Sequence, residues 1–238
     1  MIRNSTSPRR MLKSALHAVA IAAALCIAPV AQAGVLDFET APDSPFVFAG
    51  DILTFGNYVV EGAGTAGFVG AITNNGACDL QCPVNNATNY YAGLNDGYIV
   101  LSMVDRSSFT LASLDASFIG TGGTYPVVAG LLYLAAFDAV GQVAEIYLDL
   151  AGPTGSNFNF ATYDLSAFGA GLTFTDLLIA SYACDGSGNC DRTTNQAQFA
   201  LDNVVTVNAA GDVPEPGTFA LLGLGLLGLR TFARRRAA

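Results

Sequence analysis

The sequence is poor in the residue types on which most enzyme sites and nucleic-acid interfaces depend. Its one histidine is His17, it has no tryptophan, and only 12% of its 238 residues are charged. Between residues 34 and 212 the basic residues are Arg106 and Arg192 against 18 acidic ones, a net charge of −16. Nucleic-acid binding is excluded because phosphate contacts need clustered lysine and arginine. Histidine-based catalysis and histidine-ligated metal centres are excluded for this segment, since it has no imidazole.

The first 33 residues have the pattern of a signal peptide. Basic residues up to Lys13 precede an apolar run over 15–30, which ends in Ala31-Gln32-Ala33. Small residues at this spacing are typical of a signal peptidase site, so we expect cleavage between Ala33 and Gly34. The alternative is an uncleaved anchor helix, which Pro29 disfavours by interrupting the run.

Residues 213–238 form a second targeting segment. Pro214, Glu215 and Pro216 precede an apolar stretch over 218–229 and then an arginine cluster at 234–236. The prolines disfavour a helix around Glu215 and keep it accessible. Twelve apolar residues fall short of the ~20 that span a bilayer comfortably, and the arginines favour the cytoplasmic side. We expect a short hydrophobic transmembrane helix that holds the protein transiently at the inner membrane; a permanent anchor is the alternative.

This order of motif, helix and arginines resembles the PEP-CTERM sorting signal of Gram-negative bacteria that make exopolysaccharide. The resemblance implies that Pro214, Glu215 and Pro216 are recognised by an exosortase-type membrane protease, which cleaves near the motif and passes the protein to the surface or outward. Gln198, Phe199 and Asp202 also resemble the QFxxD type of these proteins.

The segment 34–212 is predicted to be all-β. Short apolar runs are broken by Gly, Asn, Asp and Pro, and no helical period persists. About ten strands favour a jelly-roll-like two-sheet sandwich. For the most apolar run a buried helix is the alternative, but Gly123, Pro126 and Gly141 punctuate it. The predicted strands cover 35–39, 46–48, 52–61, 98–104, 109–119, 127–137, 143–150, 158–163, 172–182 and 198–207.

Both ends of this segment are similar to bacterial jelly-roll domains, many of which are carbohydrate-binding-like: it opens with Leu36-Asp37-Phe38-Glu39 and closes with a Phe-x-Leu-Asp-Asn-Val strand. First and last strands of such sandwiches often lie together, which would bring Asp37 or Glu39 close to Asp202. Clustered carboxylates repel unless a cation or hydrogen bonds compensate them. We therefore expect a calcium site at Glu39 and Asp202, or else an Asp202 that binds neighbouring backbone amides. The loop 185–191 has oxygen side chains at alternating positions, but Cys190 stands where an EF-hand has glycine, so we expect a turn.

Four cysteines follow the signal peptide. An even number in an exported protein predicts two disulfides, and the pairs Cys78–Cys82 and Cys184–Cys190 each bracket a short polar loop. A four-thiolate zinc site is the alternative, for which these spacings are untypical.

The function that the sequence predicts is an exported structural protein of the cell surface or extracellular matrix, associated with exopolysaccharide or biofilm and without enzymatic activity. Its partners would be signal peptidase, the exosortase-type protease and the polysaccharide. One alternative is a carbohydrate-binding module, with Tyr90-Tyr91 as a stacking platform unless these rings pack a loop against the sheet. Another is a glycan hydrolase that uses a carboxylate pair.

Overall fold

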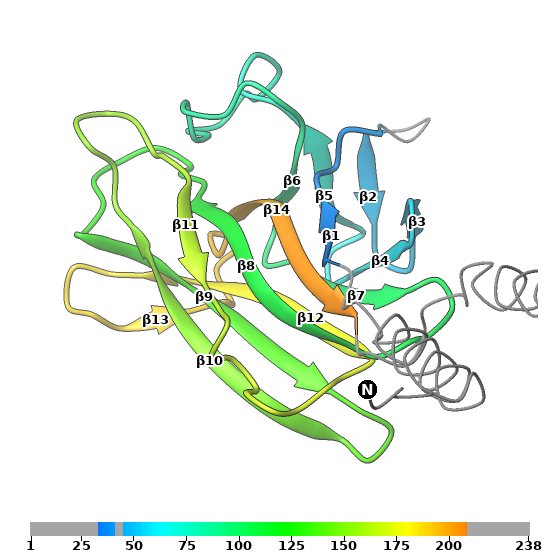
Figure 1. Ribbon diagram of the computed structural model, residues 1–238. Helices are drawn as coiled ribbons and strands as arrows, with labels where there is room; N and C mark the ends of the chain where they lie inside the picture. Colours follow the sequence, from blue (N-terminus) through cyan, green and yellow to red (C-terminus); the bar gives the residue numbers. More distant parts are fainter. Residues whose placement is uncertain (1–32, 41–44, 209–238) are drawn as a thin grey trace, which may run out of the picture. The chain divides into compact units, whose positions relative to one another are not determined.

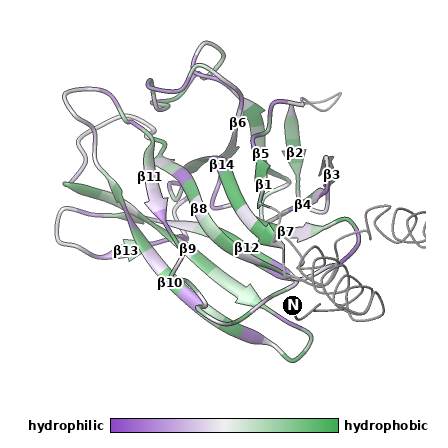
Figure 2. Cartoon of the chain, in the orientation of Figure 1, coloured by the Kyte–Doolittle hydropathy of each residue, from purple (hydrophilic) through white to green (hydrophobic). Residues whose placement is uncertain are grey.

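The strands form where apolar side chains alternate with polar ones. In the computed structural model, which describes residues 33–40 and 45–208, β10 (Gln142–Ala151) is a clear case. Ile146 and Leu148 pack against the core, while Glu145 and Tyr147 on the opposite face are exposed. Successive side chains of a strand point to opposite faces, so this pattern places one face of β10 against the interior. Figure 2 shows the alternation of hydrophilic and hydrophobic residues along β10.

The strands build two antiparallel seven-stranded sheets (Figure 1). Sheet A has the order β11-β8-β14-β6-β5-β2, with β1 also paired to β14: β1 (Ala33–Leu36), β2 (Phe46–Phe48), β5 (Phe68–Thr73), β6 (Tyr90–Gly93), β8 (Phe109–Phe118), β11 (Ala161–Asp164) and β14 (Phe199–Asn208). Sheet B has the order β10-β9-β12-β7-β4-β3, with β13 paired to β12: β3 (Ile52–Phe55), β4 (Tyr58–Ala63), β7 (Tyr98–Met103), β9 (Val128–Phe137), β10, β12 (Asp176–Cys184) and β13 (Cys190–Asp191).

Eight of these strands have the connectivity of a jelly roll. Sheet A contains the order β6-β14-β8-β11 and sheet B the order β7-β12-β9-β10, so the chain crosses between sheets at most of its connections. The predicted all-β, jelly-roll-like sandwich is confirmed. Within the described residues there is no helix, and therefore none that is apolar and long enough to cross a membrane. The predicted signal peptide and C-terminal helix lie outside the described residues, apart from the end of the signal peptide at Ala33.

The core lies between the sheets and is rich in phenylalanine. Phe109 and Phe174 pack edge to face with ring centroids 4.8 Å apart, and both are fully buried. Aromatic rings bury a large apolar area per side chain, which is the main favourable term in folding. The other fully buried phenylalanines of this core are Phe38, Phe118, Phe158 and Phe199.

The strand prediction contained two kinds of error, missed strands and strands joined into one. The run 127–137 is strand β9 and not a helix, as predicted. The prediction missed β5, β6 and β13, and it joined β3 and β4, which a turn at Gly56 separates. Strands β5 and β6 are short and contain glycine where buried rings from neighbouring strands come close: a Cβ at Gly93 would overlap the ring of Phe199.

Candidate functional site

The two ends of the sandwich meet at β1 and β14. These strands pair antiparallel, with Gly34 opposite Thr206 and Leu36 opposite Val204, which confirms that the first and last strands lie together. Tyr58 from sheet B reaches this junction, where its hydroxyl lies 2.8 Å from the hydroxyl of Thr206. The predicted cleavage bond between Ala33 and Gly34 falls inside β1, so cleavage there would keep three of its four ladder pairs. The sorting residues Pro214, Glu215 and Pro216 lie outside the described residues.

A polar cluster surrounds Asp202 on the outer face of sheet A. Asp202 is 1% exposed and pairs across the ladder with Asp115 of β8. A β-bulge follows Asp202, and Asn203 within it has a φ of 47°, a left-handed conformation that asparagine tolerates. The Asn203 backbone donates a 2.8 Å hydrogen bond to Asp202, and its side-chain amide donates a 2.9 Å bond to Asp115. Asn86 donates a further 2.7 Å hydrogen bond to the Asp202 carboxylate.

The pKa of Asp202 reflects this environment. Burial raises it to about 6, and the hydrogen bonds from Asn86 and Asn203 lower it by less than burial raises it. Repulsion by Asp115 and by Glu39 adds to the rise, which places Glu39 within electrostatic reach of Asp202. The structure thus brings the two predicted calcium ligands into one neighbourhood.

The arrangement around Asp202 is that of a hydrogen-bonded cluster. Amide N–H groups of Asn86 and Asn203 point at the carboxylate oxygens, where a cation would need oxygen ligands instead. Asp37, the other predicted neighbour, accepts a 3.2 Å hydrogen bond from the backbone of Glu39. Among the residues that the structure describes, no group of three or more His, Cys, Asp or Glu side chains is arranged to hold a metal ion. The residues as placed do not fit calcium, and calcium binding stays a prediction.

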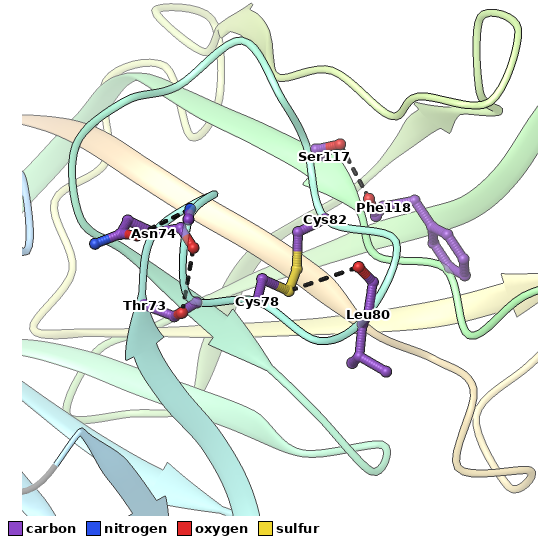
Figure 3. Close-up of a disulfide and its surroundings, with 8 residues drawn as sticks. Thr73, Asn74, Cys78, Leu80, Cys82, Ser117 and Phe118 are labelled. Atoms are coloured by element: carbon purple, nitrogen blue, oxygen red, sulfur yellow. Dashed lines mark hydrogen bonds between the residues drawn. A yellow bond between two sulfur atoms is a disulfide. The ribbon is translucent and has the colours of Figure 1, made fainter.

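The β5–β6 connection, residues 74–89, covers the outer face of sheet A; we call it the cover loop. The disulfide Cys78–Cys82 closes its first part beside Ser117 and Phe118 of β8 (Figure 3). Farther along, Asn85 accepts a 2.7 Å hydrogen bond from the backbone of Phe160 and donates one of 3.1 Å to its carbonyl. These contacts join the cover loop to the segment before β11.

A small second core lies on this outer face. It contains Tyr90, Ala92, Cys82, Ile119 and Ala200, of which Tyr90 is fully buried. The Tyr90 ring packs edge to face on Phe160 at 5.3 Å. The expectation of a Tyr90-Tyr91 stacking platform is wrong, because both rings are fully buried, Tyr91 in the main core and Tyr90 in the second core. The alternative, tyrosines that pack a loop against the sheet, is correct for Tyr90.

The second disulfide, Cys184–Cys190, joins the ends of β12 and β13, so both predicted pairs are present. Within the loop that it closes, Asp185 accepts hydrogen bonds from the backbones of Ser187 and Asn189. These bonds confirm a turn and explain why the pKa of Asp185 is lowered. A cavity of about 550 Å³ opens between this loop and residues 121–126. Its lining includes three glycines, three threonines, Tyr125 and the carboxylates Asp185 and Asp191.

The outer face of sheet B carries an aromatic group that sequence reasoning missed. We call it the tyrosine surface: Tyr98, Tyr133, Tyr147, Tyr182 and Arg192. Its tyrosines come from the four adjacent strands β7, β9, β10 and β12. Tyr133 and Tyr147 are direct ladder partners with ring centroids 4.8 Å apart, and Tyr182 lies 6.4 Å and 6.0 Å from them. The only signal in the sequence was at Tyr147, which lies between Glu145 and Asp149 on its strand face, and the neighbours of each tyrosine on other strands were unknown.

Arg192 completes the tyrosine surface at its β7 side. Its guanidinium lies 5.2 Å from the ring centroid of Tyr98 and 5.9 Å from that of Tyr182, within the range of cation–π attraction. It also donates a 2.9 Å hydrogen bond to the backbone carbonyl of Asp96. The Asp96 carboxylate in turn accepts backbone hydrogen bonds from Asn195 and Ala197. These bonds fix the segment that carries Arg192.

Comparison with known proteins identifies the C-terminal segment and the fold. The PEP-CTERM protein-sorting motif matches residues 212–237, as the resemblance predicted. This match fits a protein that is exported and then recognised by an exosortase. No curated protein sequence matches the chain.

Among solved structures, a DUF4465 family protein from Bacteroides caccae matches with a TM-score of 0.50 and 13% identity, over 75% of this chain and 100% of that chain. At this identity the likeness shows the fold alone. Two carbohydrate-binding modules have TM-scores too low to carry an argument. TmCBM61, in complex with β-1,4-galactotriose, has a TM-score of 0.34 at 8% identity, over 72% of this chain and 92% of its own. The family 11 module from Clostridium thermocellum, in complex with a mixed-linked tetrasaccharide, has a TM-score of 0.30 at 13% identity, over 76% of this chain and 97% of its own.

Proposed function

We propose that this chain is an exported structural protein of the cell surface or extracellular matrix, sorted by an exosortase-type protease and associated with exopolysaccharide or biofilm. The observation that carries the proposal is the order of its parts: β14 ends the disulfide-bonded sandwich at Asn208, and the sorting motif match begins at residue 212. The sandwich would be the part of the chain that is exported, and the segment after it would be the sorting signal that is removed. Disulfides favour an oxidising destination.

The burial and hydrogen bonds of the QFxxD residues support a structural role for this motif. Phe199 is fully buried in the main core, and Asp202 is the centre of the cluster at the bulge of β14. Gln198 is buried and donates a hydrogen bond of 3.2 Å to the backbone of Asn195. The motif would therefore specify how the last strand closes the sandwich before the sorting segment begins.

The proposal includes no catalysis. Asp115 and Asp202 face one another on neighbouring strands, but Asn203 hydrogen-bonds to both carboxylates and Asp202 is almost completely buried. A glycosidic bond between two catalytic carboxylates needs access to both. The geometry of this pair supports a structural role over the alternative of a glycan hydrolase.

Sorting is tested by mass spectrometry of the chain recovered from the medium or cell surface of a host with the exosortase. We expect an N-terminus at Gly34 and a C-terminus near Pro214, and we expect Glu215→Ala to retain the C-terminal segment in the membrane fraction. The control is Asp212→Asn, which lies outside the Pro-Glu-Pro residues. Recovery of mature exported protein with Arg236 still present would contradict the proposal.

Association with the matrix is tested by co-sedimentation of the full chain with the host's exopolysaccharide, in calcium and again in a chelator. Saturable binding supports the proposed role. Dependence on calcium would support bridging of the strongly negative sandwich to an acidic polysaccharide by divalent cations, since like charges otherwise repel. Absence of binding in both buffers would contradict the association with polysaccharide.

A further inference from the structure

We propose that the tyrosine surface on the outer face of sheet B binds a neutral polysaccharide by stacking sugar rings on its tyrosines. This inference rests on the proposed extracellular role and names the site and the ligand class for it. The observation behind it is a continuous group of aromatic side chains on the outer face of sheet B, in which Tyr147 is 50% exposed and Arg192 lies over the rings of Tyr98 and Tyr182.

The tyrosines are on the solvent side of sheet B and are not required by its core. On β9 the core residues are Leu132 and Leu134, and Tyr133 between them points outward. On β10 the exposed Tyr147 alternates with Ile146 and Leu148, which pack inward. Tyr147 is 50% exposed, although a polar side chain at this position would avoid exposing an aromatic ring to water. The free face of the ring is therefore available to a ligand.

The register places the rings in a row across the strands. Tyr147 is opposite Tyr133, and Tyr133 is opposite Ala180 of β12. Ile179 is opposite Ile99, so Tyr98 follows on the next strand at the level of Ala180. Between the rings the row has the small, buried Ala180. Such a row suits an extended chain lying across the strands of the sheet.

The hydroxyl group of Tyr133 is held in place by a polar neighbour. Tyr133 donates a 2.8 Å hydrogen bond to Glu145, and Gln142 donates a second one of 2.9 Å to the same carboxylate oxygen. These bonds fix the Tyr133 ring and lower the pKa of Glu145, which stays an ionised acceptor. Aromatic rings with fixed orientation lose little conformational entropy when a ligand stacks on them.

The charge of this face favours a neutral ligand. Glu145 and Asp149 lie on the same face of β10 as Tyr147 and are exposed, and Glu61 is exposed on β4. The one cation of the surface, Arg192, is already engaged by two rings and a backbone carbonyl. Anionic ligands such as nucleic acids, anionic lipids and acidic polysaccharides would be repelled. Carboxylates instead accept hydrogen bonds from sugar hydroxyls, while the C–H face of a pyranose packs on a tyrosine ring.

A second copy of the chain is a poorer occupant than a polysaccharide. Each sandwich segment has a net charge of −16, so two acidic faces brought together would repel. The same argument disfavours acidic protein partners. A neutral glycan brings hydroxyl donors and apolar ring faces without charge, which complements both the rings and the carboxylates of this face.

The test is affinity electrophoresis of the processed protein, purified from the exported fraction of an expressing host, in native gels that contain a soluble neutral polysaccharide. Mixed-linkage β-glucan, galactan and xylan are the neutral probes, and alginate is the acidic one. We expect at least one neutral probe to retard the wild type and alginate not to do so. Tyr147→Ala should weaken the retarding interaction by about tenfold or more, as loss of an aromatic anchor does at an interface.

Two matched variants separate binding from folding. Tyr147→Phe keeps the ring and should retain binding within about twofold, because stacking needs the ring and not the hydroxyl. Phe48→Ala removes an aromatic side chain of equal exposure, 49%, from β2 of sheet A and should leave retardation unchanged. Circular dichroism of every variant should match the wild type.

Three results would overturn the inference. The first is no retardation of the folded wild type by any neutral probe. The second is equal retardation of wild type and Tyr147→Ala, which would place the glycan elsewhere. The third is concentration-dependent self-association lost in Tyr147→Ala without glycan binding, which would assign the surface to contacts between copies. None of these would affect the C-terminal cleavage that tests the sorting proposal, so the two can fail separately.

Discussion

The two outer faces of the sandwich differ in how far their tyrosines are buried. On sheet A, Tyr90 is fully buried in the second core, and Asp202 is buried on the same sheet. On sheet B, Tyr147 is half exposed and packs on the ring of Tyr133 at 4.8 Å. The same side chain is thus part of a core on one face and of a surface on the other. What distinguishes the faces is a loop of 16 residues, 74–89, which the fold places over sheet A alone.

This contrast assigns stability to one face and recognition to the other. Covering sheet A adds a second core, a disulfide and the Asp202 cluster to the fold. On the outer face of sheet B, Tyr147, Glu145 and Asp149 are exposed to solvent. Exposed aromatic groups are informative because soluble proteins seldom gather them on a surface without a use.

The largest expected difference is between tyrosine truncations on the two faces. Tyr90→Ala should lower the free energy of unfolding by about 3–5 kcal/mol, since it opens a cavity in the second core. Tyr147→Ala should lower it by less than about 1 kcal/mol, because half of that ring is already in water. Urea denaturation of both variants measures the difference. Equal losses would contradict the division between a structural and a free face.

Tyr90→Phe sharpens the same comparison. The Tyr90 hydroxyl is buried without a hydrogen-bond partner among the described residues. Its removal should therefore leave the protein as stable as the wild type or more stable, since an unpaired buried hydroxyl is costly. A marked loss of stability in this variant would show that the hydroxyl has a partner in solution.

The two disulfides should contribute similar stability with different local effects. Replacing Cys78 and Cys82 by serine, or Cys184 and Cys190 by serine, should cost about 2 kcal/mol by loop closure. Only the first pair closes the cover loop, so only its loss should expose residues 74–89 to proteolysis. Limited proteolysis with mass spectrometry checks this, and cleavage of the cover loop in both variants would contradict it.

Asp202 should make the protein less stable as the pH rises. Its pKa is about 6 in the folded protein, against about 4 in an unfolded chain. The folded state therefore holds the proton more tightly, and this contribution to stability is complete below pH ~4 and lost as the pH passes ~6.

The measurement is the melting temperature of the wild type relative to Asp202→Asn between pH 4.5 and 7. A relative fall of about 2–4 °C is expected, equivalent to about 1 kcal/mol after allowing for solvent screening. The lowered pKa values of Glu145 and Asp164 act in the opposite direction but below this window. A flat difference would contradict the buried, repelled carboxylate. If calcium binds here, it should raise the wild-type melting temperature and leave Asp202→Ala, itself less stable, unaffected.

The smallest effect is expected from Tyr133→Phe on sheet B. It removes the hydrogen bond to Glu145, which retains its bond from Gln142. Because this site is at the surface, the cost should be within about 0.5 kcal/mol. Urea denaturation measures it, and a cost above about 1.5 kcal/mol would show that the tyrosine surface is mainly structural.

Local patterns predicted the parts of this molecule that depend on neighbours in the sequence. The strand β9 followed from apolar residues between turn residues, and each disulfide from two cysteines around a short polar loop. The pairing of β1 with β14 followed from resemblance to a class of folds. Strands β5 and β6 were missed because they contain glycines. These glycines make room for rings of neighbouring strands, and a single segment of sequence does not show those rings.

The candidate sites show the same limit. Tyr90 and Tyr91 stood out because they are adjacent and lie in a polar stretch, yet both are buried. Tyr133, Tyr147 and Tyr182 are separated by 14 and 35 residues, and only the order β10-β9-β12 brings their rings together. Glu39 and Asp202 were placed in one neighbourhood, but their hydrogen-bond donors from Asn86 and Asn203 depend on the cover loop and the bulge.

The sequence by itself determined the class of fold, the strong negative charge of the sandwich segment, the pairing of the cysteines and the match of the C-terminal segment to a sorting motif. These depend on composition, on short spacings and on contiguous residues. Only the tertiary structure decided which face of the sandwich is covered, which tyrosines are core and which are surface, and how Asp202 is compensated. Those properties arise from contacts between strands far apart in the chain, and the packing of the two sheets fixes them together.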